Sequence, residues 1–239
     1  MDKIDLLLAL RQGELSLQGQ FLQGSNYTFL GDLIYDDACL KVVYKPTRGE
    51  QPLWDFPTGS LSKREVAAYL LSEALGWELV PPTIYRHDAP MGPGSLQLYI
   101  EHDSDYHYFN FKETDRQRLR PTMAFDLLVN NADRKGSHVI IDENQHIWLI
   151  DHGVCFHTDD KLRTVIWDFA SEPIPKLLAN DIRRVVPGLQ KGHPLYQELL
   201  SYLRSEEIAA VEKRARKLLS SGTYPRPPEQ RRAYPWPPV

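Results

Sequence analysis

The sequence is short of cysteine, of long apolar runs and of excess positive charge, and each shortage argues against a class of protein. The 239 residues include two cysteines, Cys39 and Cys155, without C-x-x-C spacing, which argues against structural zinc. No stretch approaches the roughly 20 apolar residues of a membrane span, and the run Leu6–Leu10 is too short for a signal-peptide core. The net charge of −4 is unlike that of a general nucleic-acid binder. We therefore expect a cytoplasmic protein without nucleic-acid partners or a membrane span.

The composition that remains is that of an ordinary globular protein, 42% hydrophobic and 25% charged. Residues 13–46 are punctuated by glycine and show alternating apolar positions, which predicts short strands. A helix is predicted next, with Ser62 and Glu65 as an S-x-x-E capping box and Gly76 as its left-handed end. Another strand is predicted over residues 95–101.

The chain becomes helical in character from residue 115. Pro121 suits the first turn of a helix, a hairpin is predicted between residues 139 and 150, and two amphipathic helices are predicted near Pro194–Leu203 and Glu206–Leu219.

This order of elements predicts an α+β fold with the two lobes of an atypical kinase. We expect a β-rich lobe with one helix over residues 1–101, a mainly helical lobe over 102–220 and an extended, loosely held proline-rich tail over 221–239.

Two acidic loops suit phosphoryl transfer, which needs a cation on the phosphates, an oxygen-bound metal ion and an acid group that orients the attacking hydroxyl. Asp133 lies in the loop Asn131–His138, directly after a predicted helix. Asp151 follows an apolar strand and precedes Gly153, which allows the backbone to turn closely past a ligand. Each loop alone also suits an ordinary turn. Together they predict a metal and a nucleophile on either side of one phosphate.

Lys45 ends an apolar strand and has two interpretations, as does Glu65. Lys45 suits an edge-strand lysine that discourages aggregation, and Glu65 suits the capping box. Alternatively, Lys45 contacts nucleotide phosphates while Glu65 holds its ammonium group in position. Lys41 lies on the same strand and face and is the natural comparison.

Five segments, in family order, resemble the phosphatidylinositol 3-/4-kinase-like superfamily, especially the type II phosphatidylinositol 4-kinases and their bacterial relatives. They span roughly residues 13 to 157 and are Val43–Pro46, Arg64–Tyr69, Gly94–Glu101, Asn131–Arg134 and Ile150–Gly153. The resemblance implies that Lys45 contacts the phosphates of ATP, that Asp133 is the catalytic acid-base or orienting residue, and that Asp151 is the principal metal ligand.

The same resemblance implies where the rest of the nucleotide binds. The hinge would start at Gln97, and backbone groups near Tyr99, Ile100 and Glu101 would receive the adenine. Ser25 and Asn26 would occupy the phosphate-covering loop, which is a looser match because no G-x-G-x-x-G is present.

The chain departs from the family pattern at His138, where these kinases usually carry an asparagine as second metal ligand. Imidazole is a poor ligand for Mg²⁺ but acceptable for Mn²⁺. We therefore expect ATP with Mg²⁺ or Mn²⁺, with His138 as a candidate metal ligand. The long activation and substrate-binding loop after Asp151 is missing, so lipid specificity is not implied.

The leading hypothesis is an ATP-dependent phosphotransferase that moves the γ-phosphoryl group to a hydroxyl of an unknown protein or small-molecule acceptor. The alternatives are a catalytically silent, nucleotide-binding pseudokinase, favoured by His138, and a nucleotidyl transferase that uses the same cleft.

Overall fold

The computed structural model describes residues 1–21 and 26–239. Its amino-terminal part is a five-stranded antiparallel sheet with the strand order β1-β2-β3-β5-β4. The central strand, β3, buries Val42 and Tyr44, and its alternation directs Lys45 to the opposite face. The strands are β1 Glu14–Gln20, β2 Phe29–Tyr35, β3 Ala38–Pro46, β4 Thr83–Arg86 and β5 Gly94–Leu98.

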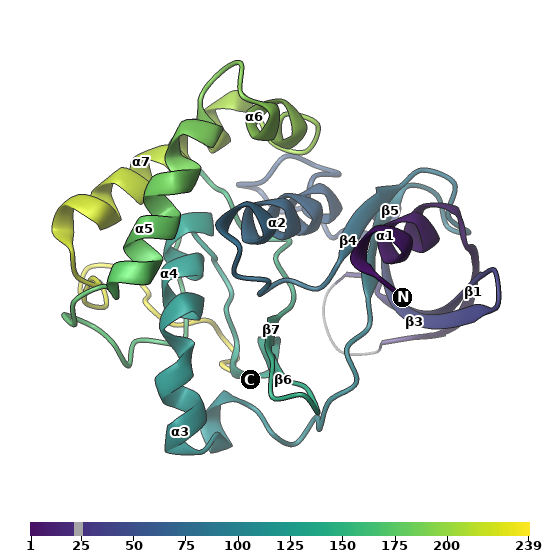
Figure 1. Ribbon diagram of the computed structural model, residues 1–239, viewed down its shortest axis with the longest axis horizontal. Coiled ribbons are helices and arrows are strands. Elements are labelled where there is room, and N and C mark those ends of the chain that lie inside the picture. Colours follow the sequence, from purple (N-terminus) through teal and green to yellow (C-terminus); the bar gives the residue numbers. More distant parts are fainter. Residues whose placement is uncertain (22–25) are drawn as a thin grey trace.

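Helix α1 (Lys3–Gln12) packs on one face of this sheet (Figure 1). Its Leu10 is buried with Leu33 and Leu96 in a core that belongs to the sheet. Asp2 caps the helix by accepting a hydrogen bond from the N–H of Asp5 at 2.9 Å. Helix α1 was not predicted, because the apolar run Leu6–Leu10 was compared only with the core of a signal peptide.

Helix α2 (Leu61–Leu75) begins differently from the prediction. Ser62 and Glu65 form no capping box; instead, the carboxylate of Glu50 accepts hydrogen bonds from the first two N–H groups of the helix, at 3.1 and 2.8 Å. The capping-box prediction was therefore wrong, and the carboxylate of Glu65 is available for other contacts. Gly76 ends the helix with φ 72°, as predicted.

A second, larger core lies among α2 and the elements that follow the sheet. Figure 1 shows α2 between the sheet and the helical part of the molecule, so this helix connects the two cores. The elements are α3 Glu113–Arg116, α4 Arg120–Val129, β6 Val139–Ile141, β7 Ile147–Leu149, α5 Lys176–Val185, α6 Pro194–Leu199 and α7 Ser205–Ser221. Over residues 1–21 and 26–239, no helix has both the length and the apolar character needed to cross a membrane.

Most predicted elements are present, and three differences remain besides α1 and the start of α2. The helix with Pro121 in its first turn, the β6–β7 hairpin and the two last helices are confirmed. Strand β5 ends at Leu98 rather than at residue 101. Helix α5 was not predicted, although its buried Leu178, Ile182 and Val185 follow helical spacing.

The third difference is the proline-rich tail, which is extended but not loosely held. Tyr224 is 1% exposed, and its hydroxyl donates a hydrogen bond to the carbonyl of Arg120 at 2.9 Å. Ala233 is also buried, and its carbonyl accepts a hydrogen bond from the N–H of Thr164 at 3.1 Å. The prolines predicted the backbone shape, but the residues between them pack against the larger core.

Candidate active site

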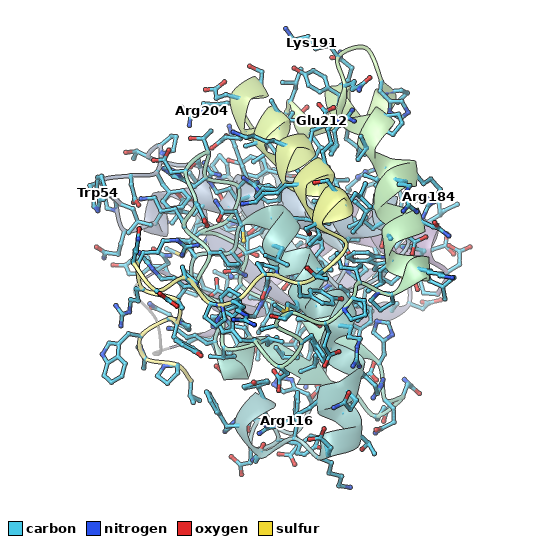
Figure 2. All side chains as sticks on the ribbon, turned by 90° about the vertical axis from the view of Figure 1, so that its left-hand side faces the viewer. Trp54, Arg116, Arg184, Lys191, Arg204 and Glu212 are labelled. Atoms are coloured by element: carbon cyan, nitrogen blue, oxygen red, sulfur yellow. The ribbon has the colours of Figure 1, made fainter. Side chains whose placement is uncertain are left out.

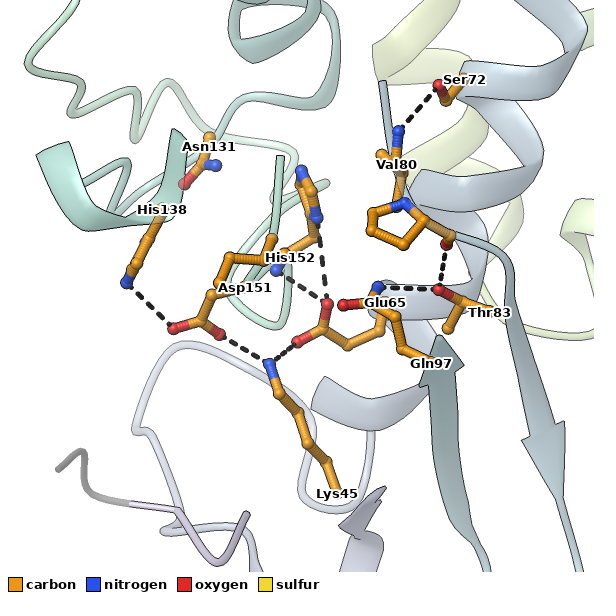
Figure 3. Close-up of polar contacts among 12 residues, drawn as sticks. Lys45, Glu65, Ser72, Val80, Thr83, Gln97, Asn131, His138, Asp151 and His152 are labelled. Atoms are coloured by element: carbon orange, nitrogen blue, oxygen red, sulfur yellow. Dashed lines mark hydrogen bonds and ion pairs between the residues drawn. The ribbon is translucent and has the colours of Figure 1, made fainter. Parts of the chain in front are cut away.

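Lys45 is the centre of an ion-pair cluster built from three separate elements (Figure 3). Its ammonium group, at the end of β3, pairs with Glu65 on α2 and with Asp151 after β7, where Nζ lies 3.0 Å from Oδ1. Glu65 is 3% exposed at its side chain, whereas Asp151 is 49% exposed. The structure thus brings together the predicted phosphate lysine, its helix partner and the predicted metal ligand.

The electrostatics of this cluster keep Lys45 and Asp151 charged. Burial would lower the pKa of Lys45, but Asp151 and Glu65 outweigh that effect and raise it. The charge of Lys45 lowers the pKa of Asp151 far below its usual range, although burial opposes this shift. Asp151 is therefore an ionised carboxylate, the form that a hard cation binds.

Asp151 has an unusual backbone conformation, with φ 61°. A non-glycine residue in the left-handed region is uncommon, and such strained residues cluster at functional sites. The following N–H, of His152, donates a hydrogen bond to Oε2 of Glu65 at 2.9 Å. Glu65 therefore holds both Lys45 and the backbone next to Asp151.

The buried guanidinium of Arg134 links the loop containing Asp133 to the segment containing Asp151. Its Nε lies 3.1 and 3.2 Å from the carboxylate oxygens of Asp126, and its Nη1 donates to the carbonyl of Ile150 at 2.8 Å. Its Nη2 lies 2.8 Å from Nε2 of His152. Burial and the positive charge of Arg134 lower the pKa of His152, so this ring is neutral and accepts the bond.

Asp126 supports the same loop from helix α4. Its carboxylate accepts hydrogen bonds from Asn131 at 3.3 Å and from Thr164 at 3.1 Å, in addition to those from Arg134. The position of Asp126, one helical turn before Asn130, was the only sign in the sequence that it could support this loop. An ordinary polar position on a helix explained it equally well. Nothing in the sequence indicated that Arg134 and His152 would be fully buried partners.

Asp133 is half-buried beside the ammonium group of Lys135, a residue to which no role was assigned from the sequence. Nζ of Lys135 lies 3.4 Å from Oδ2 of Asp133. Burial raises the pKa of Asp133 to about 6, with Lys135 opposing the shift and Asp151 adding to it. A carboxylate with a pKa near 6 can accept a proton at neutral pH more readily than an exposed aspartate.

His138 faces the predicted metal ligand, with Nε2 3.5 Å from Oδ2 of Asp151. Burial lowers the pKa of His138 to about 4, so the ring is neutral near pH 7. Its Nδ1 is buried and finds no hydrogen-bond partner in the described part of the chain. Within residues 1–21 and 26–239, no group of three or more His, Cys, Asp or Glu side chains is placed to hold a metal ion. The donors fit a cation that arrives with nucleotide phosphates, since Mg²⁺ sites commonly combine one or two carboxylates with substrate phosphates.

The predicted adenine-binding residues lie at the end of β5. The side chain of Gln97 is committed to Thr83, with Nε2 2.7 Å from Oγ1. The N–H of Tyr99 donates to the carbonyl of Lys41 at 3.0 Å. The N–H groups of Ile100 and Glu101 find no acceptor within residues 1–21 and 26–239 and could bind a ligand.

The predicted phosphate-covering loop is placed only in part. Ser25 lies outside the described residues. The Oδ1 atom of Asn26 accepts a hydrogen bond from the N–H of Gln51 at 2.6 Å. No hydrogen bond or ion pair in the described chain connects Asn26 to Lys45 or Asp151.

The loop between β3 and α2 contacts the segment that follows Asp151. Oδ2 of Asp55 lies 2.9 Å from Nζ of Lys161, and the carbonyl of Asp55 lies 3.0 Å from Nε2 of His157. Trp54 projects from the surface in Figure 2 and is 92% exposed. The centroid of its ring lies 4.9 Å from Nζ of Lys161. These contacts join the start of α2, and with it Glu65, to the part of the molecule that carries Asp151.

Three solved structures, two of them of proteins named as kinases, share this fold. The structure of hydra Fam20 with sugar has a TM-score of 0.61 at 15% identity and covers 92% of this chain and 89% of that one. The Golgi casein kinase with Mn and ADP bound has a TM-score of 0.60 at 15% identity, covering 91% and 74%. The Helicobacter pylori proinflammatory kinase CtkA has a TM-score of 0.53 at 11% identity, covering 90% and 94%. The predicted α+β atypical kinase fold is confirmed, whereas the phosphatidylinositol 3-/4-kinase-like assignment is not.

No protein-family model matches the sequence. One curated protein, Rv2133c of Mycobacterium tuberculosis strain H37Rv, is 38% identical over 263 aligned positions, which cover 95% of this chain and 93% of that protein. Its name states no activity. At this identity and coverage, the chain belongs to the family of Rv2133c.

Proposed function

We propose that this protein is an ATP-dependent phosphotransferase that moves the γ-phosphoryl group to a hydroxyl of a protein or small-molecule acceptor. The observation that carries the proposal is the position of Lys45, whose ammonium group is held between Glu65 and Asp151. A cation fixed by a helix carboxylate, next to an ionised and half-exposed aspartate, is the arrangement that binds nucleotide phosphates with their metal.

In this proposal Lys45 donates hydrogen bonds to the α- and β-phosphates, and Glu65 keeps it in position. Asp151 binds Mg²⁺ or Mn²⁺, and the neutral ring of His138 is the second protein ligand. The metal ion, when bound, neutralises charge on the phosphate oxygens. The unpaired N–H groups of Ile100 and Glu101 receive the adenine.

Asp133 orients the acceptor hydroxyl and accepts its proton, for which its raised pKa is suited. Lys135, at 3.4 Å from Asp133, supplies positive charge where the transferred group gains negative charge. Because Arg134 connects this loop to the carbonyl of Ile150, the proposed base and the proposed metal ligand keep a fixed separation.

Two features of the similar structures support this assignment. The Golgi casein kinase structure contains Mn and ADP, which supports a nucleotide and a divalent cation as ligands of this chain. The names of these structures include a casein kinase and a Fam20 with sugar, which favours protein or small-molecule acceptors over lipids. We also propose that residues 1–101 and 102–220 act as two lobes on either side of the ion pair between Lys45 and Asp151.

A pseudokinase is the second candidate, because His138 stands where related kinases usually carry asparagine. Incubation with ATP labelled on the γ- or the α-phosphate separates the possibilities. Transfer of the γ-label to casein, to sugars or to the protein itself, and its loss in Asp133→Asn, would support the kinase. Transfer of the α-label would show a nucleotidyl transferase, and ATP binding without either transfer would show a pseudokinase.

A further inference from the structure

The carboxyl-terminal residues 229–239, called the C-terminal strap below, contact the loop that contains Asp133. The carbonyl of Pro238 accepts a hydrogen bond from the N–H of Gly136 at 2.8 Å, three residues beyond Asp133. Figure 1 shows the chain end beside the β6–β7 hairpin, which directly follows this loop. Residues of the strap therefore lie against the loop that contains Asp133.

A second set of contacts reaches the same loop through residues 160–167. The carbonyl of Ala233 accepts hydrogen bonds from the N–H of Thr164 at 3.1 Å and from Nε1 of Trp167 at 3.3 Å. Arg231 donates to the carbonyl of Leu162 at 2.6 Å and forms an ion pair with Asp160. The C-terminal strap thus holds residues 160–167 by main-chain and side-chain contacts.

Residues 160–167 in turn hold the loop that contains Asp133. The N–H of Arg134 donates to the carbonyl of Arg163 at 3.0 Å, and the N–H of Val165 donates to the carbonyl of Arg134 at 3.2 Å. The N–H of Arg163 donates to the carbonyl of Asn131 at 2.8 Å. Backbone hydrogen bonds therefore connect three neighbouring segments in order: the loop that contains Asp133, residues 160–167 and the C-terminal strap.

The contacts of the C-terminal strap do not involve the proposed catalytic side chains. In the described chain, no hydrogen bond or ion pair joins residues 229–239 to Lys45, Asp133 or Asp151. On its other side, Gly136 is so close to Phe109 that an added Cβ would lie 2.8 Å from the ring. Gly136 is thus held between Phe109 and the strap, and among the described residues the strap forms no hydrogen bond or ion pair with the side chain of Asp133.

We infer that the C-terminal strap is a positioning element of the catalytic loop, on which phosphoryl transfer depends and nucleotide binding does not. The inference rests on the proposed function, since it assigns a role in that reaction. Lys45 and Asp151 are held by their own ion pair and by Glu65, which binds both Lys45 and the N–H of His152. In the described chain, the strap forms no hydrogen bond or ion pair with these residues. Removing it should loosen residues 131–136 and leave the phosphate-binding cluster intact.

The first test is a chain truncated after Pro228, which keeps the buried Tyr224 and its bond to Arg120. Hydrogen exchange is measured at the N–H groups of residues 131–138 and of α2. We expect exchange at Gly136 to be roughly tenfold faster in the truncated protein, because its acceptor is gone, and exchange in α2 to be unchanged. Equal protection of Gly136 in the two proteins would overturn the inference.

The second test compares γ-phosphoryl transfer in the two proteins. We expect kcat to fall at least about tenfold while the KM for ATP changes less than about twofold, as for loss of an interaction that matters only in the transition state. An unchanged kcat, or a higher kcat as for an inhibitory tail, would contradict the inference. If the full-length protein transfers no phosphate, the proposed function fails, while the exchange measurement still tests the positioning.

Two tail arginines provide a matched pair if the truncated chain does not fold. Arg231 contacts residues 160–162, whereas Nε of Arg226 donates to Oγ of Ser171 at 2.9 Å, away from the catalytic loop. Arg231→Ala should speed exchange at residues 131–136 and lower kcat, and Arg226→Ala should do neither. Equal effects of the two substitutions would show that the strap has no specific action on the loop.

Discussion

Lys45→Met is the substitution that best separates a phosphate-binding lysine from one that only completes a structural ion pair. Because β3 is paired on both sides, the edge-strand explanation of Lys45 is wrong. Lys45 and Lys41 lie on the same strand, but their surroundings differ. The side chain of Lys45 is 22% exposed and contacts two carboxylates, whereas that of Lys41 is 55% exposed and pairs with the exposed Glu101. Lys41→Met is therefore a control that removes the same charge from the same strand.

The first expected effect is on the ligand-free protein. Removing one partner of a buried ion pair costs about 3–5 kcal/mol, and we expect about 3 kcal/mol because Glu65 keeps its hydrogen bond from His152. For a chain of this length, about 3 kcal/mol corresponds to a decrease in Tm of about 6–12 °C. Lys41→Met should leave Tm unchanged, because both members of its ion pair are exposed.

The second expected effect is on nucleotide binding, measured as the increase in Tm that ATP and Mn²⁺ produce within each variant. A charge-assisted hydrogen bond contributes about 1.5–3 kcal/mol, so its loss should raise Kd about 10- to 100-fold. At a ligand concentration of 100 times the original Kd, a 100-fold weaker variant would be stabilised by about 0.4 instead of about 2.7 kcal/mol. Equal nucleotide-dependent shifts in Lys45→Met and Lys41→Met would refute the phosphate role and leave Lys45 with a structural ion pair alone.

The remaining predictions concern the three groups around the proposed phosphate. Asp133→Asn should lower kcat for γ-transfer at least about 100-fold with little change in ATP binding, and Asp151→Asn should abolish both transfer and the metal dependence of ATP binding. Thermal unfolding should show that both variants are folded, and full activity of either variant would remove the substituted residue from the site. Because the raised pKa of about 6 leaves Asp133 protonated in more acidic solution, kcat/KM should fall about tenfold per pH unit below pH 6; a flat profile from pH 5 to 8 would exclude Asp133 as the base. If Nε2 of His138 binds the metal, Mn²⁺ should support ATP binding better than Mg²⁺, and His138→Asn should move the preference towards Mg²⁺; an unchanged preference would reject the ligand role.

The sequence by itself determined the order of most elements, with α1 and α5 as exceptions, and the identity of the charged residues. Alternation in β3 placed Lys45 opposite the buried Tyr44, Gly76 ended α2 in the left-handed conformation, and Asp151 followed a short apolar strand. These features depend on neighbours within a few positions, for which propensity and periodicity are informative. The roles of Lys45, Asp133 and Asp151 remain predictions, although the geometry agrees with them.

Local signals gave the wrong result where a distant partner competed. The spacing of Ser62 and Glu65 matched a capping box, yet Glu50 supplies the cap and Glu65 pairs with Lys45, 20 positions away. A buried carboxylate gains more from an ammonium group than from a helix N–H that another side chain can satisfy. Sequence spacing could not reveal this choice.

Only the tertiary structure decided which polar residues are buried and what the tail does. Arg134 is fully buried because Asp126, Ile150 and His152 all supply acceptors to it, which the sequence could not bring together. The prolines of residues 221–239 predicted an extended chain but not its course, since proline fixes backbone shape and leaves the packing partner open. The contact between Pro238 and Gly136 joins positions 102 residues apart, and it exists because the folded core offers the tail a surface and an unpaired N–H to bind.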